Sequence, residues 1–167
     1  MRARACNRIA WRAAALALLL AAAGCEDESE PGGVEPPPEP EGPRVRIASG
    51  TWRVRLARDD ESRTKGLGGV TYLPEDEGML FLFERAEADR AFWMKDCRIP
   101  LDICFLDADR RVVQVATLPA PPPGTPRHRI PRVECPEPTK YVLEVRAGAL
   151  GRAGVGVGNV AEFVNIP

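Results

Sequence analysis

The sequence is poor in histidine, the residue that enzymes use most often for acid–base chemistry and a common metal ligand. Its single histidine, His128, lies among arginines and prolines. Catalysis by a Ser-His-Asp or Cys-His arrangement therefore has one candidate base, and a zinc site needs four well-spaced ligands, which His128 and Cys135 do not supply. There is no Cys-x-x-Cys motif, and the glycine-rich segment 154–158 neither follows a strand nor opens a helix, as a dinucleotide-binding loop would. We therefore expect no metal and no cofactor.

Net charge of one sign and long hydrophobic runs are also lacking. The 167 residues carry 23 Lys and Arg against 24 Asp and Glu, so the sequence lacks the basic excess typical of a nucleic-acid partner. The apolar run at 13–23 has 11 residues, about half of the ~20 that a membrane-spanning helix needs. The length suffices for one domain of ordinary size.

The N-terminus has the pattern of an export signal. Four arginines within the first 12 residues precede the short apolar run, which ends in Ala22-Ala23-Gly24-Cys25. A basic start, a short apolar stretch and small residues at its end are typical of a secretory signal peptide. The end resembles a bacterial lipobox, which predicts a lipoprotein signal peptide over 1–25 with Cys25 as the acylated residue. An ordinary cleaved signal with a chance cysteine is the alternative.

Acyl chains on Cys25 would anchor the chain in a membrane without a spanning helix. We therefore expect an exported protein held in the bacterial cell envelope, with its domain outside the cytoplasm. Residues 26–43 contain seven acids, six prolines and no bases. Such a segment cannot bury a core, and it predicts an extended, solvated tether. From residue 44 onward 19 bases and 17 acids remain, so the expected domain is close to neutral.

Period-two alternation marks the region from Arg44 onward as rich in strands. Apolar residues alternate with polar ones at 45–47 and 52–56 around Ser49-Gly50, and acids at 59–61 begin a short helix that Gly68-Gly69 ends. Further strands are expected at 79–83, 91–94, 99–106, 112–118, 141–145 and 160–164, with helical turns at 147–153 and a Pro-rich loop at 119–138. Residues 44–167 are thus predicted to form one β-rich globular domain of the α+β class, mostly β: a compact small barrel or sandwich of short strands with one or two short helices.

Three blocks of sequence carry a resemblance to a known family. They are 73–83 (LPEDEGMLFLF), 92–103 with FWMKDC followed by IPLDI, and 141–145 (YVLEV) with Gly148 after it. In this order and spacing, residues 66–160 resemble the uncharacterised bacterial and archaeal family known as domain of unknown function 192. The resemblance implies a compact, mostly β fold and no particular reaction. The sequence departs from the family pattern at 66–70, where Gly68 and Val70 replace a Met and an Arg, and at Asp96 and Cys97, which replace Asn-Thr.

Three cysteines remain in the expected domain, at positions 97, 104 and 135. An exported domain lies where disulfides persist, and three cysteines allow one bridge with one thiol left over. Cys104 lies inside an apolar strand and is expected to be a small buried hydrophobe. A Cys97–Cys135 disulfide is predicted, which would pin the Pro-rich loop.

The candidate ligand site comprises Trp93, Lys95, Asp96 and Asp102. Alternation places Asp102 on the opposite strand face from Leu101, Ile103 and Phe105, and an acid within an apolar strand must be paired or hydrogen-bonded. One interpretation is a shallow site where Lys95 and Asp102 hold a polar ligand and the Trp93 ring stacks on it. The other is that Asp102 is a structural anchor that sets register or caps a backbone turn.

The leading hypothesis is a membrane-anchored, non-catalytic binding or accessory module of the envelope, with a polar small molecule or a cell-wall component as ligand. This hypothesis rests mostly on the absence of a nucleophile–base pair, a metal-binding cluster and a phosphate-binding loop. The alternative is a hydrolase acting on cell-wall or carbohydrate material through Asp96 or Asp102, which should show a carboxylate of perturbed pKa in a cleft. A second alternative is a structural partner of another envelope protein through a strand edge, which should show a large apolar patch.

Overall fold

The computed structural model describes residues 42–167. The predicted signal peptide, its Cys25 and the predicted tether up to residue 41 lie outside the described residues. The elements are β1 (Arg44–Ile47), β2 (Gly50–Ala57), α1 (Asp60–Lys65), β3 (Glu77–Glu87), β4 (Arg90–Trp93), β5 (Leu101–Leu106), β6 (Val112–Leu118), the 3-10 turn η1 (Arg127–Arg129), β7 (Arg132–Cys135), β8 (Thr139–Arg146), α2 (Ala149–Arg152) and β9 (Glu162–Val164). Within this range, no helix has both the length and the apolar character needed to cross a membrane.

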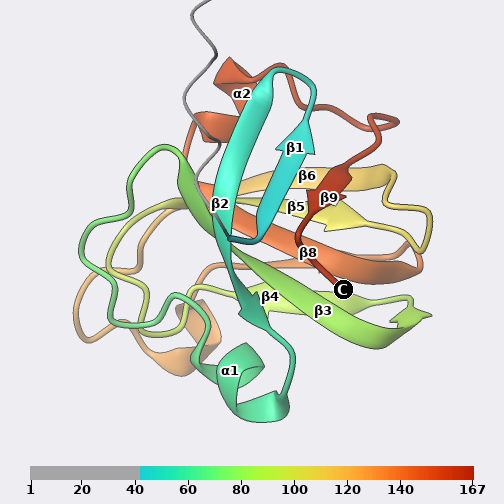
Figure 1. The fold of residues 1–167 in the computed structure, drawn as a ribbon. Helices are drawn as coiled ribbons and strands as arrows, with labels where there is room; N and C mark the ends of the chain where they lie inside the picture. The colour runs from blue at the N-terminus through green and yellow to red at the C-terminus, as the bar shows by residue number, and fades with distance from the viewer. Residues whose placement is uncertain (1–41) are drawn as a thin grey trace, which may run out of the picture. The chain divides into compact units, whose positions relative to one another are not determined.

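Seven of the strands form one strongly curled sheet in the order β6-β5-β8-β3-β2-β1-β9 (Figure 1). All neighbours are antiparallel except β2 and β3, which pair in parallel. An isolated bridge between Arg111 and Val160 joins the segments that precede the two edge strands, so the sheet curls far enough to form a half-barrel. This architecture confirms the predicted α+β, mostly β class with two short helices.

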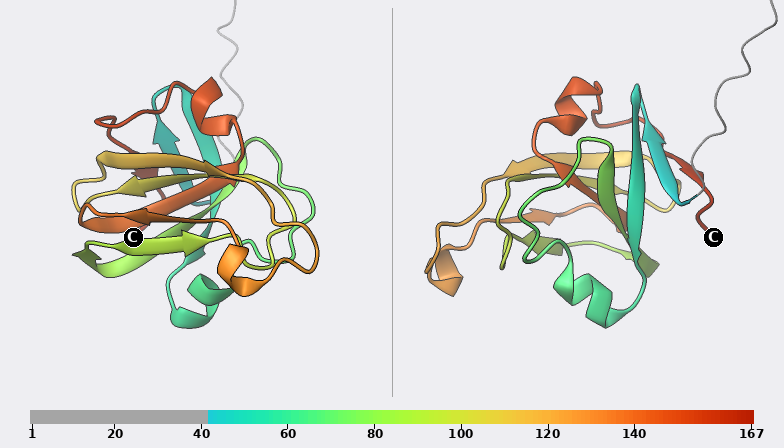
Figure 2. Two further views of the ribbon diagram at one scale, coloured as in Figure 1. Left: turned by 180° about the vertical axis from the view of Figure 1, so that it is seen from behind. Right: turned by 60° about the vertical axis from the view of Figure 1, so that its left-hand side comes forward.

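The two faces of the sheet bury two separate apolar clusters. The inner cluster fills the half-barrel and includes Trp52, Leu80, Leu143 and Leu150 of α2. The outer cluster lies on the other face and includes Phe81, Met94, Ile103 and Val142. Helices α1 and α2 lie at opposite ends of the sheet (Figures 1 and 2).

The alternation within β5 fits this division. Leu101, Ile103 and Phe105 belong to the outer cluster, whereas Cys104 and Leu106 belong to the inner one. Cys104 is fully buried there, in agreement with its expected role as a small hydrophobe.

The Pro-rich segment is more ordered than the sequence predicts. Four of its residues form β7, which pairs with β4 in an antiparallel two-stranded ribbon, with Phe92 opposite Val133 and Arg90 opposite Cys135. The ribbon packs on the outer cluster through Phe92, Val133 and Cys135. The flanking Pro131 and Pro136 concealed this strand, because proline is tolerated just outside a strand but disrupts the pattern that identifies one.

Helix α1 begins at a capping box. The Asp59 carboxylate accepts a hydrogen bond from the Ser62 N–H at 2.7 Å, and the Ser62 hydroxyl accepts one from the Asp59 N–H at 3.2 Å. The hydrogen bonds from Ser62 lower the pKa of Asp59. The helix ends at Lys65, three residues before the predicted Gly68 stop, because Gly66 adopts a positive φ of 49° that favours glycine. This early end leaves residues 66–68 free to form part of a cavity wall.

Candidate ligand-binding site

The outer face of the sheet carries a cavity of about 570 Å³, here called the basin. Its walls come from α1 and residues 66–68, from β3, from the turn between β3 and β4, and from β4 itself. Three further residues complete it: Lys95, Cys97 and, from β8, Glu144. A volume of this size is typical of sites for small molecules.

Aromatic side chains form one wall of the basin. Phe92 of β4 meets Phe81, Phe83 and Phe105 in edge-to-face contacts, with ring centroids 4.9, 6.4 and 5.7 Å apart. These contacts hold the β4–β7 ribbon against the sheet, because edge-to-face aromatic pairs stabilise a fold by more than the burial of their surface area alone. The basin therefore has an aromatic surface that is packed against the sheet.

Two arginines cover the Phe83 ring and are themselves held in place. The guanidinium carbons of Arg63 and Arg90 lie 5.3 and 3.6 Å from the ring centroid. Arg63 donates hydrogen bonds to the carbonyls of Arg58 and Leu82, and Arg90 to those of Thr139 and Arg85. Each also pairs with the acid three residues before it, Asp60 or Glu87. Both cations are thus structural parts of the wall.

Glu144 has an unusual environment. It lies on the outer face of the central strand β8, opposite Met79 of β3 and Ile103 of β5, and only 5% of its surface is exposed. Within residues 42–167 no group donates a hydrogen bond to its carboxylate or pairs with it. Burial raises the pKa of Glu144 from 4.5 to about 8, because an apolar surrounding disfavours the charged form. At neutral pH this side chain is mostly a neutral acid.

Cys97 lines the basin beside Glu144 and is a free thiol with 8% of its surface exposed. Burial, followed by the nearby carboxyls of Glu144 and Asp96, raises the pKa of Cys97 to about 11. The thiolate is the nucleophilic form, and this raised pKa keeps Cys97 in the less nucleophilic thiol form at neutral pH.

The predicted Cys97–Cys135 disulfide is not formed in the structure, where both residues are free thiols. Cys135 is fully buried at the end of β7, and the Thr139 hydroxyl donates to its sulfur at 3.5 Å. The ribbon and its aromatic contacts already hold the Pro-rich segment, so a covalent link is not needed for that purpose.

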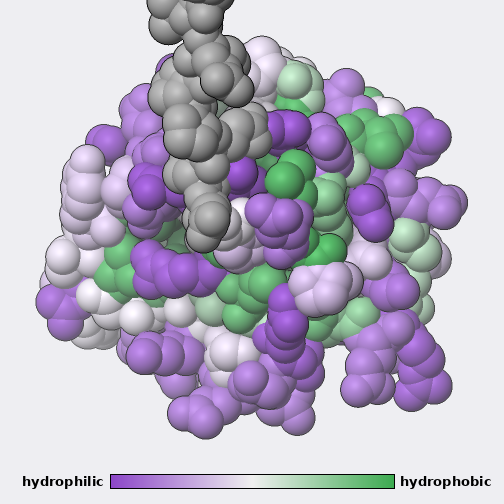
Figure 3. All heavy atoms as spheres, in the orientation of Figure 1, coloured by the Kyte–Doolittle hydropathy of each residue, from purple (hydrophilic) through white to green (hydrophobic). Residues whose placement is uncertain are grey.

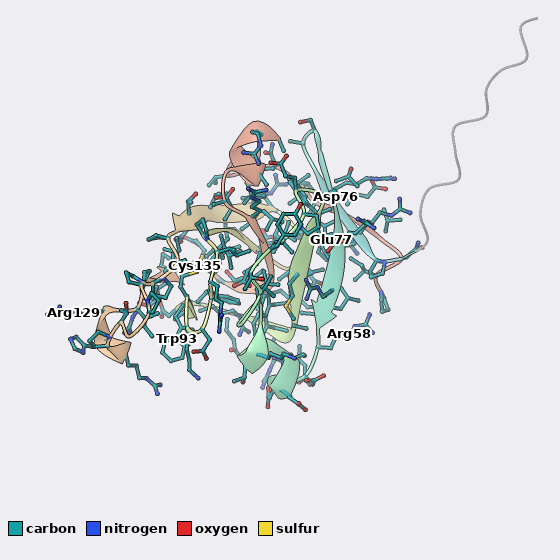
Figure 4. The ribbon with its side chains drawn as sticks, turned by 90° about the vertical axis from the view of Figure 1, so that its left-hand side faces the viewer. Arg58, Asp76, Glu77, Trp93, Arg129 and Cys135 are labelled. Carbon is teal, nitrogen blue, oxygen red and sulfur yellow. The ribbon has the colours of Figure 1, made fainter. Side chains whose placement is uncertain are left out.

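Of the predicted site residues, the structure brings Trp93 and Lys95 together in the basin. The Lys95 ammonium lies 5.9 Å from the Trp93 ring centroid and the Arg127 guanidinium 4.8 Å from it. Figure 4 shows Trp93 on the side of the domain that also carries Arg129, whereas Arg58, Asp76 and Glu77 lie on the opposite side. Trp93 is partly buried and Lys95 is exposed.

Asp96 does not line the basin. It is exposed, adopts a positive φ of 58°, and its carboxylate lies 3.7 Å from the Lys95 ammonium. Asp96 and Cys97 border a second hollow of about 620 Å³ beside the Pro-rich segment 121–125.

Asp102 lies away from the other predicted site residues, on the inner face of the sheet. Its surface is 2% exposed, and its carboxylate accepts hydrogen bonds from the Thr117 hydroxyl at 2.6 Å and from the Leu150 N–H at 3.0 Å. The second bond satisfies a free N–H at the start of α2, where no local side chain caps the helix. Asp102 therefore acts as the structural anchor that ties α2 to β5 and β6.

Sequence reasoning missed Glu144, although the signal was present. Glu144 interrupts the apolar run of the YVLEV segment, just as Asp102 interrupts that of β5. The rule that a buried acid needs a partner applied equally to both. The described residues contain no group of three or more His, Cys, Asp or Glu side chains placed to hold a metal ion.

Residues 44–163 match the family DUF192, described as "Uncharacterized ACR". The chain belongs to DUF192. Of the positions where it departs from the DUF192 pattern, Gly68 and Cys97 line the basin, while Val70 packs against the outer cluster. No curated protein matches the sequence.

Two solved structures resemble this DUF192 chain. A protein of unknown function from Novosphingobium aromaticivorans DSM 12444 is 33% identical, with 71% of this chain and 83% of that one covered and a TM-score of 0.62. A protein from Sinorhizobium meliloti 1021, described as a candidate transcription regulator, is 31% identical, with 72% and 92% covered and a TM-score of 0.63. The function of this DUF192 member must therefore be argued from its own site.

The structural role of Asp102 predicts a large loss of stability on its replacement. Asp102→Asn turns one acceptor oxygen into a donor that faces the Thr117 hydroxyl or the Leu150 N–H, and we expect the free energy of unfolding to fall by about 2–3 kcal/mol. Urea denaturation of both proteins measures this. Asp96→Asn is the matched control and should change stability by less than about 0.5 kcal/mol. Equal stability of Asp102→Asn and wild type would contradict the anchor role.

The environment of Glu144 predicts a specific pH dependence of stability. The folded protein keeps the Glu144 proton up to about pH 8, whereas the unfolded chain releases it near pH 4.5. The free energy of unfolding therefore falls as pH rises through this window. The variant Glu144→Gln cannot titrate at this position. Relative to it, the free energy of unfolding of wild type should fall by about 1.4 kcal/mol or more between pH 5 and pH 8. A difference that stays constant across these pH values would show that Glu144 is not perturbed.

Proposed function

We propose that this domain is a ligand-binding module of the cell envelope and that the basin takes up a small polar molecule. The observation that supports this most strongly is the unpartnered carboxyl of Glu144 at the floor of the basin. Trp93 and Lys95 lie at the same cavity and supply an aromatic ring and an exposed cation.

The argument from Glu144 is energetic. Burial of a carboxyl with no protein hydrogen-bond partner costs stability, and a Val or Leu at this position of β8 would avoid that cost. Among residues 42–167 the Glu144 oxygens are not fully buried unpartnered atoms, so they keep some exposure, and Glu144 lines the basin. Uncompensated polar groups with perturbed pKa values concentrate at sites that bind or react with another molecule. A ligand in the basin would supply the partner that the described residues do not.

A hydrolase is the second candidate, and the raised pKa of Glu144 favours it, because a carboxyl titrating near pH 8 can donate a proton at neutral pH. The geometry supports Glu144 for such a role rather than Asp96, which is exposed, or Asp102, which is engaged on the other face. Binding remains the leading function because no base or second carboxylate contacts Glu144 within residues 42–167.

The remaining hypothesis, a structural partner, has less support. The large hydrophobic residues that are strongly exposed are Tyr72, Val157 and Val160, and Figure 3 shows hydrophobic side chains interspersed among hydrophilic ones on the face it presents. We also favour a small molecule over a nucleic acid, since 19 bases and 17 acids from residue 44 onward leave little basic excess.

We further propose that acyl chains on Cys25 hold the protein in the envelope membrane, with the acidic, Pro-rich segment 26–43 as a tether. The support is the sequence itself: a basic start, a short apolar run and Gly24-Cys25 at its end.

Anchoring is tested with the full chain in a bacterial host. Wild type should partition into the detergent phase and incorporate labelled fatty acid, whereas Cys25→Ser should incorporate none, because Cys25 is the proposed acylation site. Cys6→Ser serves as the control and should behave as wild type. Incorporation of labelled fatty acid by Cys25→Ser would contradict anchoring through this residue.

Ligand binding is tested by thermal shift of the full chain in detergent, screened against sugars, peptidoglycan fragments, nucleotides, amino acids and peptides. A ligand at 100 times its Kd stabilises the fold by about 2.7 kcal/mol, which raises the Tm by roughly 5–20 °C. The shift should disappear in Glu144→Gln and shrink in Lys95→Ala. Lys140→Ala, outside the basin, should retain it. The proposal would be overturned if the thermal shifts persisted unchanged in Glu144→Gln. It would also be overturned if no compound of any class shifted the Tm of wild type.

A further inference from the structure

We propose that the basin selects zwitterionic ligands, with a primary ammonium group that pairs with Glu144 at the floor and a carboxylate that faces Lys65 and Lys95 at the rim. This inference rests on the proposed function, because it specifies the chemistry of the molecule that the basin binds. It follows from the distribution of charges around the cavity.

The floor offers an acid that no cation of the described residues neutralises. Glu144 lies between Met79 and Ile103 on neighbouring strands, and the aromatic rings of Phe81 and Phe92 line the same cavity. In such an apolar surrounding an ion pair is much stronger than in water. A ligand ammonium that reaches the floor would gain this interaction and would also supply the missing hydrogen-bond donor.

A metal ion fits the floor less well than an ammonium group. Calcium and magnesium require several oxygen ligands, and the other acids of the basin are Asp60, Glu87 and Asp89. Asp60 pairs with Arg63 and Glu87 with Arg90, and Asp89 is exposed in the turn between β3 and β4. Glu144 is thus the one acid at the floor among the described residues. A single carboxylate matches the single positive charge of an ammonium group.

The rim offers two cations that are free to move toward a ligand. Lys65 ends α1, is exposed, and has no ion pair among residues 42–167. Lys95 is half exposed and lies 3.7 Å from Asp96, a weak surface pair. Arg63 and Arg90, by contrast, are bound to backbone carbonyls. A carboxylate at the mouth of the basin would therefore meet the two lysines.

Binding of an ammonium group has a measurable consequence for protons. At pH 7 Glu144 is mostly protonated, because burial raises its pKa to about 8. When the ligand ammonium pairs with it, the Glu144 proton passes to the buffer and the ammonium keeps its own protons. The neighbouring Cys97 thiol, with a pKa of about 11, remains protonated throughout. An alcohol in the same place would release no proton, since it can hydrogen-bond the neutral acid.

The experiment is calorimetry of the full chain in detergent with ω-amino acids from glycine to 8-aminooctanoate. At least one length should bind, and the matched ω-hydroxy acid should bind at least tenfold more weakly. Titrations in phosphate and in Tris at pH 7 should differ by the heat of close to one proton released for each ligand bound. The corresponding alkylamine, which lacks the carboxylate, should also bind more weakly.

Three variants complete the test. Glu144→Gln should abolish the preference for the amine and the proton release, while a double change of Lys65→Ala and Lys95→Ala should abolish the preference for the carboxylate. Lys140→Ala should change neither. Equal binding of hydroxy and amino acids, or binding without proton release, would overturn the ammonium assignment and leave the proposed function intact. If no amino acid binds, the inference fails, and the broader compound screen then decides the proposed function separately.

Discussion

The register of the central strand β8 is the constraint on which the rest of the domain depends. This strand lies between β3 and β5, and its side chains alternate between the inner cluster, through Leu143 and Val145, and the outer face, through Val142 and Glu144. Gly78 of β3 pairs with Val145, and a Cβ there would lie 2.6 Å from the Glu144 carbonyl oxygen. The close approach permits little adjustment, and a slip of one residue would exchange the two faces.

The two buried acids show how one sequence signature can have two physical outcomes. Asp102 and Glu144 both interrupt apolar strands and are almost equally buried. Asp102 has two hydrogen-bond donors within 3.0 Å, so its burial stabilises the attachment of α2. Glu144 has none among the described residues, so its burial costs stability. The difference depends on what the fold brings opposite each side chain, and neighbouring sequence does not contain that information.

This explains how far the sequence could predict the molecule. Alternation identified most strands, and capping acids identified α1, because these signals are local. The parallel pairing of β2 with β3 and the β4–β7 ribbon depend on distant contacts, and prolines on either side concealed β7. Trp93 and Lys95 were predicted to belong to one site, and they do share the basin. They are only two positions apart in the sequence, so the fold keeps them close together. Glu144 reaches the same cavity only through the pairing of β8 with its neighbours.

The inner and outer faces of the sheet are suited to different tasks. The inner face is filled by the inner cluster and closed at one end by α2, which Asp102 holds in place. On the outer face the ribbon covers only part of the sheet, and both hollows described above border Cys97 there. The proposed ligand site therefore lies outside the inner cluster, so Glu144 does not interrupt the packing inside the half-barrel. This separation is what makes Glu144 tolerable at the centre of the sheet.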